Sequence, residues 1–264
     1  MAIIWLQLTS AGFIFVSSPR VIKTTEDETM SGLISRISEI TNYLNVDFLG
    51  GPKILKMNWV INFQKGATAF WVLGLMYYYQ NDSDQAWVYL ALHGSYGFAW
   101  LLKDMIFPDP KWQIRVTFGG AFVAIAAVLG PYWVFPFLLI SPVLGVAHSG
   151  ASWVGLTVAI AIHTLGLAIM LTADAQKYFT LKYEPGLITT GMYRSIRHPN
   201  YLGEMMIYGA YALVVSHWIP WAILAWVWIG IFSINIAMKE RSMSRYPTWA
   251  DYQKRTKYLI PGIF

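Results

Sequence analysis

The sequence predicts an all-α integral membrane protein with seven transmembrane helices, and three observations lead to this prediction. Of the 264 residues, 56% are hydrophobic and only 12% are charged, whereas a soluble domain carries about 25% charged residues. Several apolar runs approach the roughly 20 residues that a helix needs to cross a bilayer. Lysines and arginines, with the exception of Lys65, fall in alternate loops, the distribution that sets membrane topology.

The expected spans begin and end at polar loops or at helix-breaking residues. The first, 2–16, is short for a span, but it lacks the basic n-region and cleavage site of a signal peptide. The acidic turn 80–84 separates the second span from the third, and Pro108 and Pro110 end the third. The remaining spans follow from hydropathy, and the six after the first are 57–79, 85–107, 114–129, 152–172, 200–215 and 218–238.

The basic residues determine how many times the chain crosses. Seven spans place nearly all of them on one side, in the segments 17–56, 103–115, 174–198 and the tail after 238. A further crossing at 131–147, an apolar stretch broken by prolines, would invert the later loops. We therefore interpret 131–147 as a re-entrant or interfacial segment, with the N-terminus outside and the C-terminus cytoplasmic.

The composition indicates one polytopic membrane domain over 1–264 and excludes several classes of function. There is no cysteine, so disulfides and thiolate metal sites are ruled out, and no other metal-ligand spacing occurs. The net charge of +5 reflects membrane topology and does not indicate a nucleic-acid partner. We expect a monomer in contact with membrane lipid. A bacterial inner membrane is favoured, and an endoplasmic-reticulum protein would have a similar sequence.

The run from Arg194 to Glu204 is the strongest functional signal. Two arginines and His198 stand before Pro199, which suits the first turn of a helix. Asn200 and Glu204 are four residues apart and share a face of that helix. A carboxylate one turn inside an apparent membrane span is expensive to keep there and marks a functional site.

Polar stripes on the second and third spans supply candidate catalytic residues. Lys65 continues a helical stripe of asparagines, and His93 and Tyr96 lie on a stripe of aromatic residues. Because the two spans are consecutive and antiparallel, the stripes can face each other across a cavity. A structural role is the alternative: the aromatic stripe can be packing, and Lys65 can snorkel towards the cytoplasmic face.

The cytoplasmic edge gathers charged residues of both signs at the ends of the expected spans. Such a cluster suits a phosphate-bearing cofactor whose other end reaches into the membrane, although lipid attraction is an alternative. No Gly-x-Gly-x-x-Gly follows a strand, and no strand is expected, so a Rossmann site is absent.

Two motifs together resemble a known superfamily. Arg197-His198-Pro199-Asn200-Tyr201-Leu202-Gly203-Glu204 and the terminus Leu259-Ile260-Pro261-Gly262-Ile263-Phe264 are similar to sequences of steroid 5-alpha-reductases, sterol reductases and isoprenylcysteine carboxyl methyltransferases. The Asn-aromatic-Leu-Gly-Glu run and the terminus most resemble the 5-alpha-reductase branch. The resemblance covers about 150–264, the expected cofactor-binding half, whereas 57–107 would face the substrate.

The resemblance implies that NADPH binds from the cytoplasmic side. The matching positions, together with the adjoining histidine and basic residues, are Asp174, Lys177, Arg194, Arg197, His198, Asn200, Glu204, Arg241 and Tyr246. In the reductases a second-span glutamate and a third-span tyrosine contact the substrate carbonyl. The glutamate position falls near Gln64 and Lys65, so that residue is absent here, and the tyrosine falls near His93 or Tyr96.

The expected activity is NADPH-dependent reduction of the C=C bond of an α,β-unsaturated ketone, most simply a 3-oxo-4-ene steroid that enters from the bilayer. Tyr96, His93 or Lys65 would donate to the carbonyl oxygen, where negative charge develops. Two alternatives remain open: an S-adenosylmethionine-dependent methyltransferase acting on a lipophilic substrate, and a non-catalytic membrane scaffold.

Overall fold

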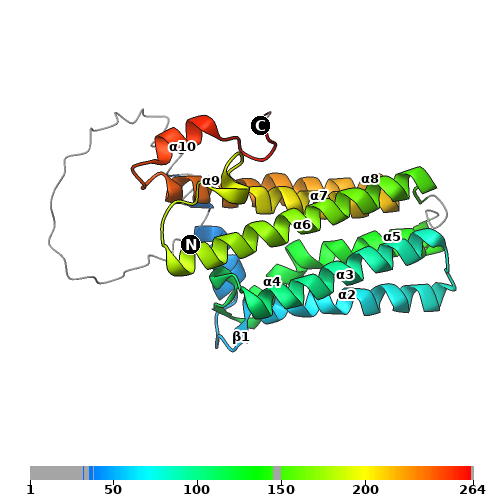
Figure 1. The fold of residues 1–264 in the computed structure, drawn as a ribbon. Coiled ribbons are helices and arrows are strands. Elements are labelled where there is room, and N and C mark those ends of the chain that lie inside the picture. The colour runs from blue at the N-terminus through cyan, green and yellow to red at the C-terminus, as the bar shows by residue number, and fades with distance from the viewer. Residues whose placement is uncertain (1–31, 33–35, 38, 145–149, 263–264) are drawn as a thin grey trace.

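A computed structural model describes residues 32, 36–37, 39–144 and 150–262. The expected first span, 2–16, and the last two residues of the terminal motif lie outside the described residues. Within the described part, six long helical runs lie side by side (Figure 1). They are α2 (Met57–Tyr79), α3 (Asp84–Ile106), the run from α4 to α5 (Phe118–Ile140), α6 (Trp153–Tyr183), α7 (Pro199–Val215) and the run from α8 to α9 (Trp218–Met243).

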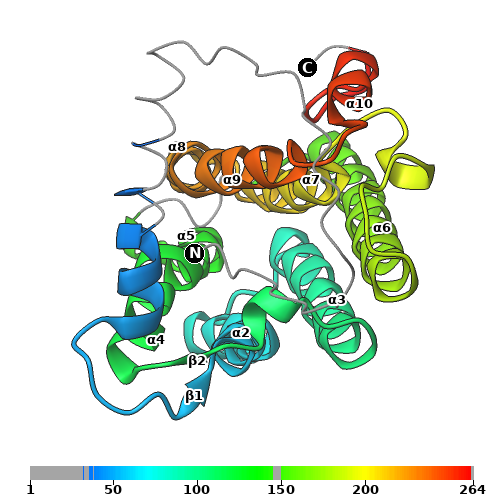
Figure 2. The same ribbon diagram turned by 90° about the vertical axis from the view of Figure 1, so that its left-hand side faces the viewer.

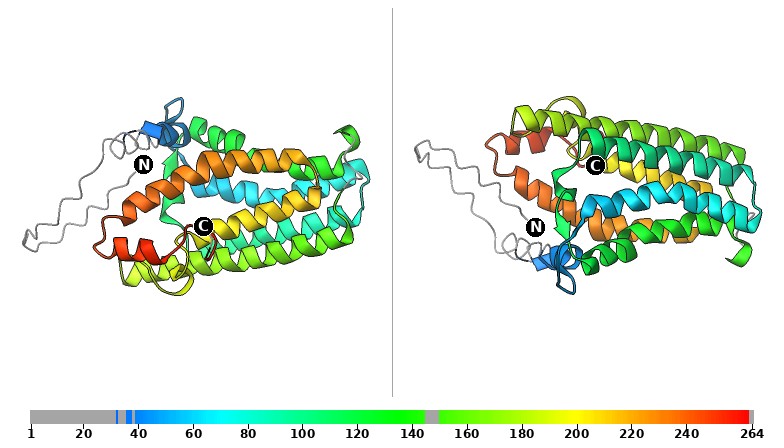
Figure 3. Two further views of the ribbon diagram at one scale, coloured as in Figure 1. Left: turned by 90° about the horizontal axis from the view of Figure 1, so that it is seen from above. Right: turned by 90° about the horizontal axis from the view of Figure 1, so that it is seen from below.

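Successive runs alternate in direction, so every second loop lies at the same end of the bundle (Figure 3). We call this the basic end. It holds the loops before α2, between α3 and α4 and between α6 and α7, together with the tail after α9. Its short elements are η1 (Tyr43–Asp47), β1 (Leu55–Lys56), η2 (Pro110–Trp112), β2 (Arg115–Val116), η6 (Gly191–Tyr193) and α10 (Trp249–Arg255), while η5 (Pro142–Leu144) lies at the other end.

The two strands form a minimal antiparallel sheet, in which Leu55 faces Val116 and Lys56 faces Arg115. The expectation of no strand was therefore wrong at this one place. The sheet joins the chain just before α2 to the chain just before α4, and so ties two helix starts together at the basic end (Figure 2).

The fourth expected span and the re-entrant segment are corrected together. The chain is helical without interruption over Phe118–Ile140, so most of 114–129 and most of the described part of 131–147 lie in one continuous helical run rather than in a span followed by a separate segment. A wide π-helical turn at η3 (Ile125–Leu129) precedes Pro131, and such a turn accommodates a residue without an amide hydrogen. The remaining parts of this run are α4 (Phe118–Ala124), η4 (Gly130–Trp133) and α5 (Val134–Ile140).

The fifth expected span, 152–172, is too short at its C-terminal end. No glycine or proline interrupts the sequence after it until Pro185, and α6 accordingly continues to Tyr183. Asp174 and Lys177 therefore lie on a helix and not in a loop. The last run resembles the Phe118–Ile140 pass, because α8 (Trp218–Ala225) continues through the π-helical η7 (Trp226–Phe232) into α9 (Ser233–Met243).

Three of the runs are long and apolar enough to cross a membrane: Phe118–Ile140, Trp153–Tyr183 and Trp218–Met243. The helices α2 and α3 are each 23 residues long but carry polar and charged residues along their length, and α7 has 17 residues. The helical fold class is thus confirmed, together with three candidate spans.

The helices α6 and α7 touch through their backbones. A Cβ atom placed on Gly203 would lie 2.6 Å from the carbonyl oxygen of Gly166 and 2.6 Å from the amide nitrogen of Met170. Real Cβ atoms do not approach backbone this closely, so position 203 requires glycine. Small residues at such crossings allow two membrane helices to pack at short range.

Replacing this glycine should therefore destabilise the protein. We expect Gly203→Ala to lower the free energy of unfolding by about 1–3 kcal/mol, because the overpacked methyl group outweighs the higher helix propensity of alanine. Gly74→Ala on α2 is the matched control, since nothing lies within 4 Å of its added Cβ, and it should raise the melting temperature slightly. A melting temperature of Gly203→Ala at or above that of the parent would contradict the packing described.

Candidate functional site

One face of α7 carries the polar residues of the central motif into the bundle. Pro199 occupies the first turn, and Asn200, Glu204 and Tyr208 follow at intervals of four residues, one above the other. Glu204 is half-buried and forms no hydrogen bond or ion pair with any described residue. The face thus presents a carboxylate that is available to a ligand.

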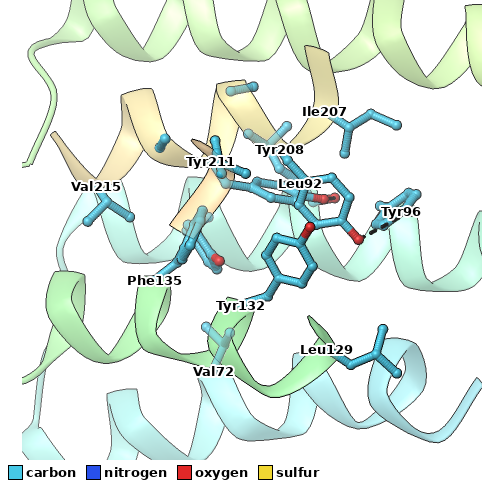
Figure 4. Close-up of a cluster of buried hydrophobic side chains, with 14 of the residues drawn as sticks. Val72, Leu92, Tyr96, Leu129, Tyr132, Phe135, Ile207, Tyr208, Tyr211 and Val215 are labelled. Carbon is cyan, nitrogen blue, oxygen red and sulfur yellow. Dashed lines mark hydrogen bonds between the residues drawn. The ribbon is translucent and has the colours of Figure 1, made fainter. Parts of the chain in front are cut away.

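One turn deeper, three side chains from three helices form a polar chain. Lys65 Nζ donates a hydrogen bond to the hydroxyl oxygen of Tyr208. That hydroxyl lies 3.5 Å from the hydroxyl of Tyr96, and all three side chains are buried. Figure 4 shows the Tyr96 and Tyr208 hydroxyl groups meeting beside Tyr132. The structure therefore brings the predicted pair Lys65 and Tyr96 together and adds Tyr208.

The ammonium group of Lys65 lies inside a cage of aromatic rings. Its Nζ is 4.7 Å from the ring centre of Tyr96 and 4.9 Å from that of Tyr208, with Trp100 and Tyr132 at 5.3 and 5.8 Å. Ring faces attract cations, and this attraction is stronger where water is excluded. Lys65 is only 3% exposed, so it does not snorkel to the surface.

A charged lysine can only donate hydrogen bonds, and this fixes the direction of the first bond in the chain. An ammonium group has three N–H donors and no acceptor. The Tyr208 oxygen therefore accepts from Lys65, whereas either hydroxyl can be the donor between Tyr208 and Tyr96. When Tyr208 is the donor, the Tyr96 oxygen accepts and the O–H of Tyr96 is free to donate to a third group.

His93 belongs to a second polar layer, further from the basic end. Its Nδ1 is 3.1 Å from the hydroxyl of Tyr89, and its ring stacks on Tyr211 at 4.4 Å with an angle of 6° between the planes. The hydroxyl of Tyr211 also contacts Nε2 of His163 at 3.2 Å. His93 Nε2 is buried and has no partner among the described residues, so it is the open position of this layer.

The asparagine stripe on α2 has a structural partner. Asn58 and Asn62 both donate to the carboxylate of Asp104 on α3, at 2.9 and 2.8 Å, and Trp100 donates to Asn62 at 3.1 Å. These bonds align α2 with α3 and so position Lys65 beside Tyr96. No carboxylate contacts Lys65 in the described structure.

Ion pairs fasten α6 to the rest of the basic end. Asp174 pairs with Lys103 of α3 at 2.9 Å, and both side chains are buried. Lys177 pairs with Asp109 in the α3–α4 loop at 3.2 Å. Burial alone would raise the pKa of Asp109, but the ammonium of Lys177 and the backbone N–H of Lys111 outweigh it and lower that pKa to about 2. Two of the predicted cofactor positions, Asp174 and Lys177, therefore have protein partners.

Arg197 and His198 fasten the tail of the chain. Glu240 on α9 accepts from Nε of Arg197 at 2.9 Å and lies 2.8 Å from Nε2 of His198. Arg197 also donates to the carbonyl oxygen of Thr256 at 2.8 Å, and all of these side chains are buried. The backbones join as well, because Ile196 pairs with Lys257 in a parallel bridge. We call the residues Arg197, His198, Glu240 and Thr256 the latch.

The other predicted cofactor residues lie at the surface of the basic end. Arg194 and Arg241 are exposed, and Tyr246 accepts from Arg245 at 3.0 Å. The sequence analysis did not identify Tyr208 and Tyr132, because both look like ordinary aromatic residues within apolar runs. The four-residue spacing from Glu204 to Tyr208 was the available signal. No group of three or more possible metal ligands occurs in the residues that the structure describes.

These features define a class: a helical-bundle protein with three candidate membrane-spanning helices and a buried polar axis. The family model described as "Protein of unknown function (DUF1295)" matches residues 108–256, more than half of the chain. The chain belongs to this family, which is part of the steroid reductase-like superfamily.

Two relatives in fission yeast, Schizosaccharomyces pombe, are similar to parts of the chain. The uncharacterized protein C594.04c is 30% identical over 93 residues, which cover 33% of this chain and 27% of the relative. The uncharacterized protein C7D4.09c is 35% identical over 63 residues, which cover 22% of this chain and 23% of the relative. The matches therefore span about a quarter of each relative.

The latch should make stability depend on pH. Burial lowers the pKa of His198 below its ordinary value of 6.5, and Glu240 opposes this only in part. The unfolded chain therefore binds a proton at His198 more readily than the folded protein does. His198 makes its full contribution to the free energy of unfolding above about pH 6.5. This contribution is lost as the pH falls towards the pKa of His198 in the folded protein, which is lower.

We expect the melting temperature of the parent to decrease more between pH 7 and pH 5 than the melting temperature of His198→Gln. Glutamine can still donate to Glu240 but does not titrate, so the variant isolates this one proton. Melting curves recorded in the same detergent at both pH values give the comparison. Equal losses in the two proteins would remove His198 from the pH dependence.

Proposed function

We propose that this protein is a membrane-embedded, NADPH-dependent reductase of the C=C bond of an α,β-unsaturated ketone, with 3-oxo-4-ene steroids as the substrate class. The observation behind the proposal is the order of residues on α7. Glu204, which forms no hydrogen bond or ion pair with a described residue, is one turn from Tyr208, which belongs to the polar chain with Lys65 and Tyr96. A carboxylate for the cofactor and the tyrosine that adjoins the proposed substrate donor thus share one helix face, with Cβ atoms about 6 Å apart.

The residues of the basic end fit the proposed cofactor. Glu204 can accept from a nicotinamide carboxamide, and Asn200 can both donate and accept one turn nearer the basic end. Exposed arginines at that end, among them Arg241, suit phosphate groups because a guanidinium binds phosphate through two parallel hydrogen bonds. When bound, NADPH would supply the hydride that adds to the β-carbon of the enone.

The polar chain would stabilise the charge that develops during that addition. As the carbon–carbon double bond is reduced, negative charge builds on the carbonyl oxygen of the substrate. Tyr96 would donate to this oxygen, with its own oxygen accepting from Tyr208 and Tyr208 accepting from Lys65. A donor that meets more charge in the transition state than in the ground state accelerates the step. A proton from water then adds to the α-carbon and completes the reduction.

His93 would support this arrangement from the neighbouring layer. Its ring lies 6.4 Å from that of Tyr96, centre to centre, and its Nε2 is open. The flat apolar substrate would enter from the lipid between helices. Within the superfamily, we assign the protein to the steroid 5-alpha-reductase branch on the strength of the Asn-Tyr-Leu-Gly-Glu run at 200–204.

The proposed topology has seven crossings with the basic end in the cytoplasm. Because the chain has no cysteine of its own, single cysteines report which side each end occupies. Asp82→Cys at the far end should react with an impermeant maleimide in intact cells, and Ser244→Cys at the basic end should react only after permeabilisation. The opposite labelling pattern would refute the orientation.

Binding of the cofactor is the first test of the function. Glu204→Gln should weaken NADPH binding about tenfold or more, the loss expected when a charged hydrogen-bond acceptor is removed. Titration of the purified full-length chain measures the affinity, and Glu184→Gln, an exposed carboxylate at the same end, is the control. Unchanged affinity in folded Glu204→Gln would remove Glu204 from the cofactor site. Binding of S-adenosylmethionine in place of NADPH would favour a methyltransferase, and binding of neither would favour a scaffold.

Turnover tests the carbonyl donor. Tyr96→Phe should lower the rate of NADPH oxidation with a 3-oxo-4-ene steroid by about 100-fold or more, as the loss of one oxyanion donor typically does. Tyr132→Phe keeps a ring in the same cage and should stay within a few-fold of the parent. If Tyr96→Phe were as active as Tyr132→Phe, the donor would have to be His93 or Lys65.

A further inference from the structure

A surface hollow at the basic end has the character of an anion site. It lies between the loop that leads into α7 and the end of α10, and Figure 2 shows these two segments side by side at the rim of the bundle. Two guanidinium groups and three hydroxyl groups line it. The lining residues are Thr189, Thr190, Gly191, Arg194, Ser195 and Arg255.

The two arginines are brought together by a specific contact. Tyr252 on α10 donates from its hydroxyl to the carbonyl oxygen of Tyr193, at 2.8 Å. Arg194 directly follows Tyr193, and Arg255 is three residues after Tyr252 with its guanidinium over the Tyr252 ring at 5.8 Å. Both arginines are exposed, and neither forms an ion pair with a described residue.

The loop that carries Arg194 is held rigidly. Gln176 on α6 donates to the carbonyl oxygen of Thr190 at 2.9 Å and accepts from the amide of Met192 at 2.9 Å. Gly191 between them has φ +57°, and a Cβ atom there would lie 2.6 Å from the Gln176 side chain. The hollow is therefore organised before any ligand arrives, which reduces the entropy lost on binding.

The position of Gln176 along α6 sets the depth of the hollow relative to the membrane. With 31 residues, α6 is about 46 Å long, whereas the hydrocarbon core of a bilayer is about 30 Å thick. If α6 enters the core at the exposed Trp153, a usual interfacial residue, it leaves about 20 residues later, near Ala173. Gln176 and the loop it holds then lie in the layer of lipid headgroups.

We propose that this hollow binds the phosphate group of an anionic membrane lipid. Arg194 and Arg255 would hold the phosphate oxygens, and the hydroxyl groups of Thr190 and Ser195 would donate to those left over. The site is distinct from the face of α7 that carries Glu204, and it does not depend on the proposed reductase activity. A free phosphate compound is the other source of the same chemistry.

The test uses the purified full-length chain and follows its melting temperature, because a ligand that binds the folded state raises it. Dioctanoyl phosphatidylglycerol should raise the melting temperature of the parent, and dioctanoyl phosphatidylcholine, which has no net charge, should not. Arg194→Gln/Arg255→Gln should bind the anionic lipid about tenfold more weakly or worse. Lys254→Gln removes one positive charge from the neighbouring exposed position of α10 and should behave as the parent.

Each outcome supports or overturns the proposal. An equal shift in the double variant and in Lys254→Gln would mean general charge attraction and overturn the site. A shift of the same size with inorganic phosphate or NADPH alone, lost in the double variant, would assign the hollow to a free phosphate and overturn the lipid. If the double variant fails to fold, Arg255→Lys replaces it in the test, because lysine keeps the positive charge but lacks the planar guanidinium group. Full binding by that variant would then count against the proposed geometry.

Discussion

The backbone contact between α6 and α7 is the constraint on which the interior depends. Gly203 touches α6 so closely that α7 cannot rotate or slide without a clash. This contact fixes which way the next residue, Glu204, faces and which way Tyr208 faces one turn later. The glycine of the motif is thus explained by packing, and the carboxylate beside it is positioned as a result. Ion pairs from Asp174 and Lys177, further along α6, hold the end of this helix to Lys103 and Asp109.

Burial of the polar head group of Lys65 is energetically unfavourable, and the groups around it explain how it is kept in the interior. Lys65 forms no ion pair with a described residue, yet it has a phenol oxygen as acceptor and four ring faces around it. Such a site would be destabilising if any of its polar groups lacked a partner. The bonds from Asn58 and Asn62 to Asp104 keep α2 in the register that this arrangement requires.

Hydropathy and charge predicted much of the fold, because apolar length and loop charge are local properties of the sequence. Six of the seven expected spans correspond to helical runs, and the spacing of Asn200 and Glu204 correctly placed them on one face. Three features of the structure could not be predicted from the sequence. Pro131 suggested a break, but a π-helical turn absorbs it. Tyr208 looked like one apolar residue among many. The partners of Arg197 lie more than 40 residues away in sequence, and no local pattern announces such a contact.

The latch also imposes an order on the assembly of the chain. During synthesis the start of α7 emerges well before Glu240 and Thr256, so the guanidinium of Arg197 stays without its partners while the last long helical run is being made. Only when the residues around Lys257 have appeared can the parallel bridge to Ile196 close. Inserting the helices up to α9 therefore does not complete the fold, because the basic end is closed by residues that follow this helix in the chain.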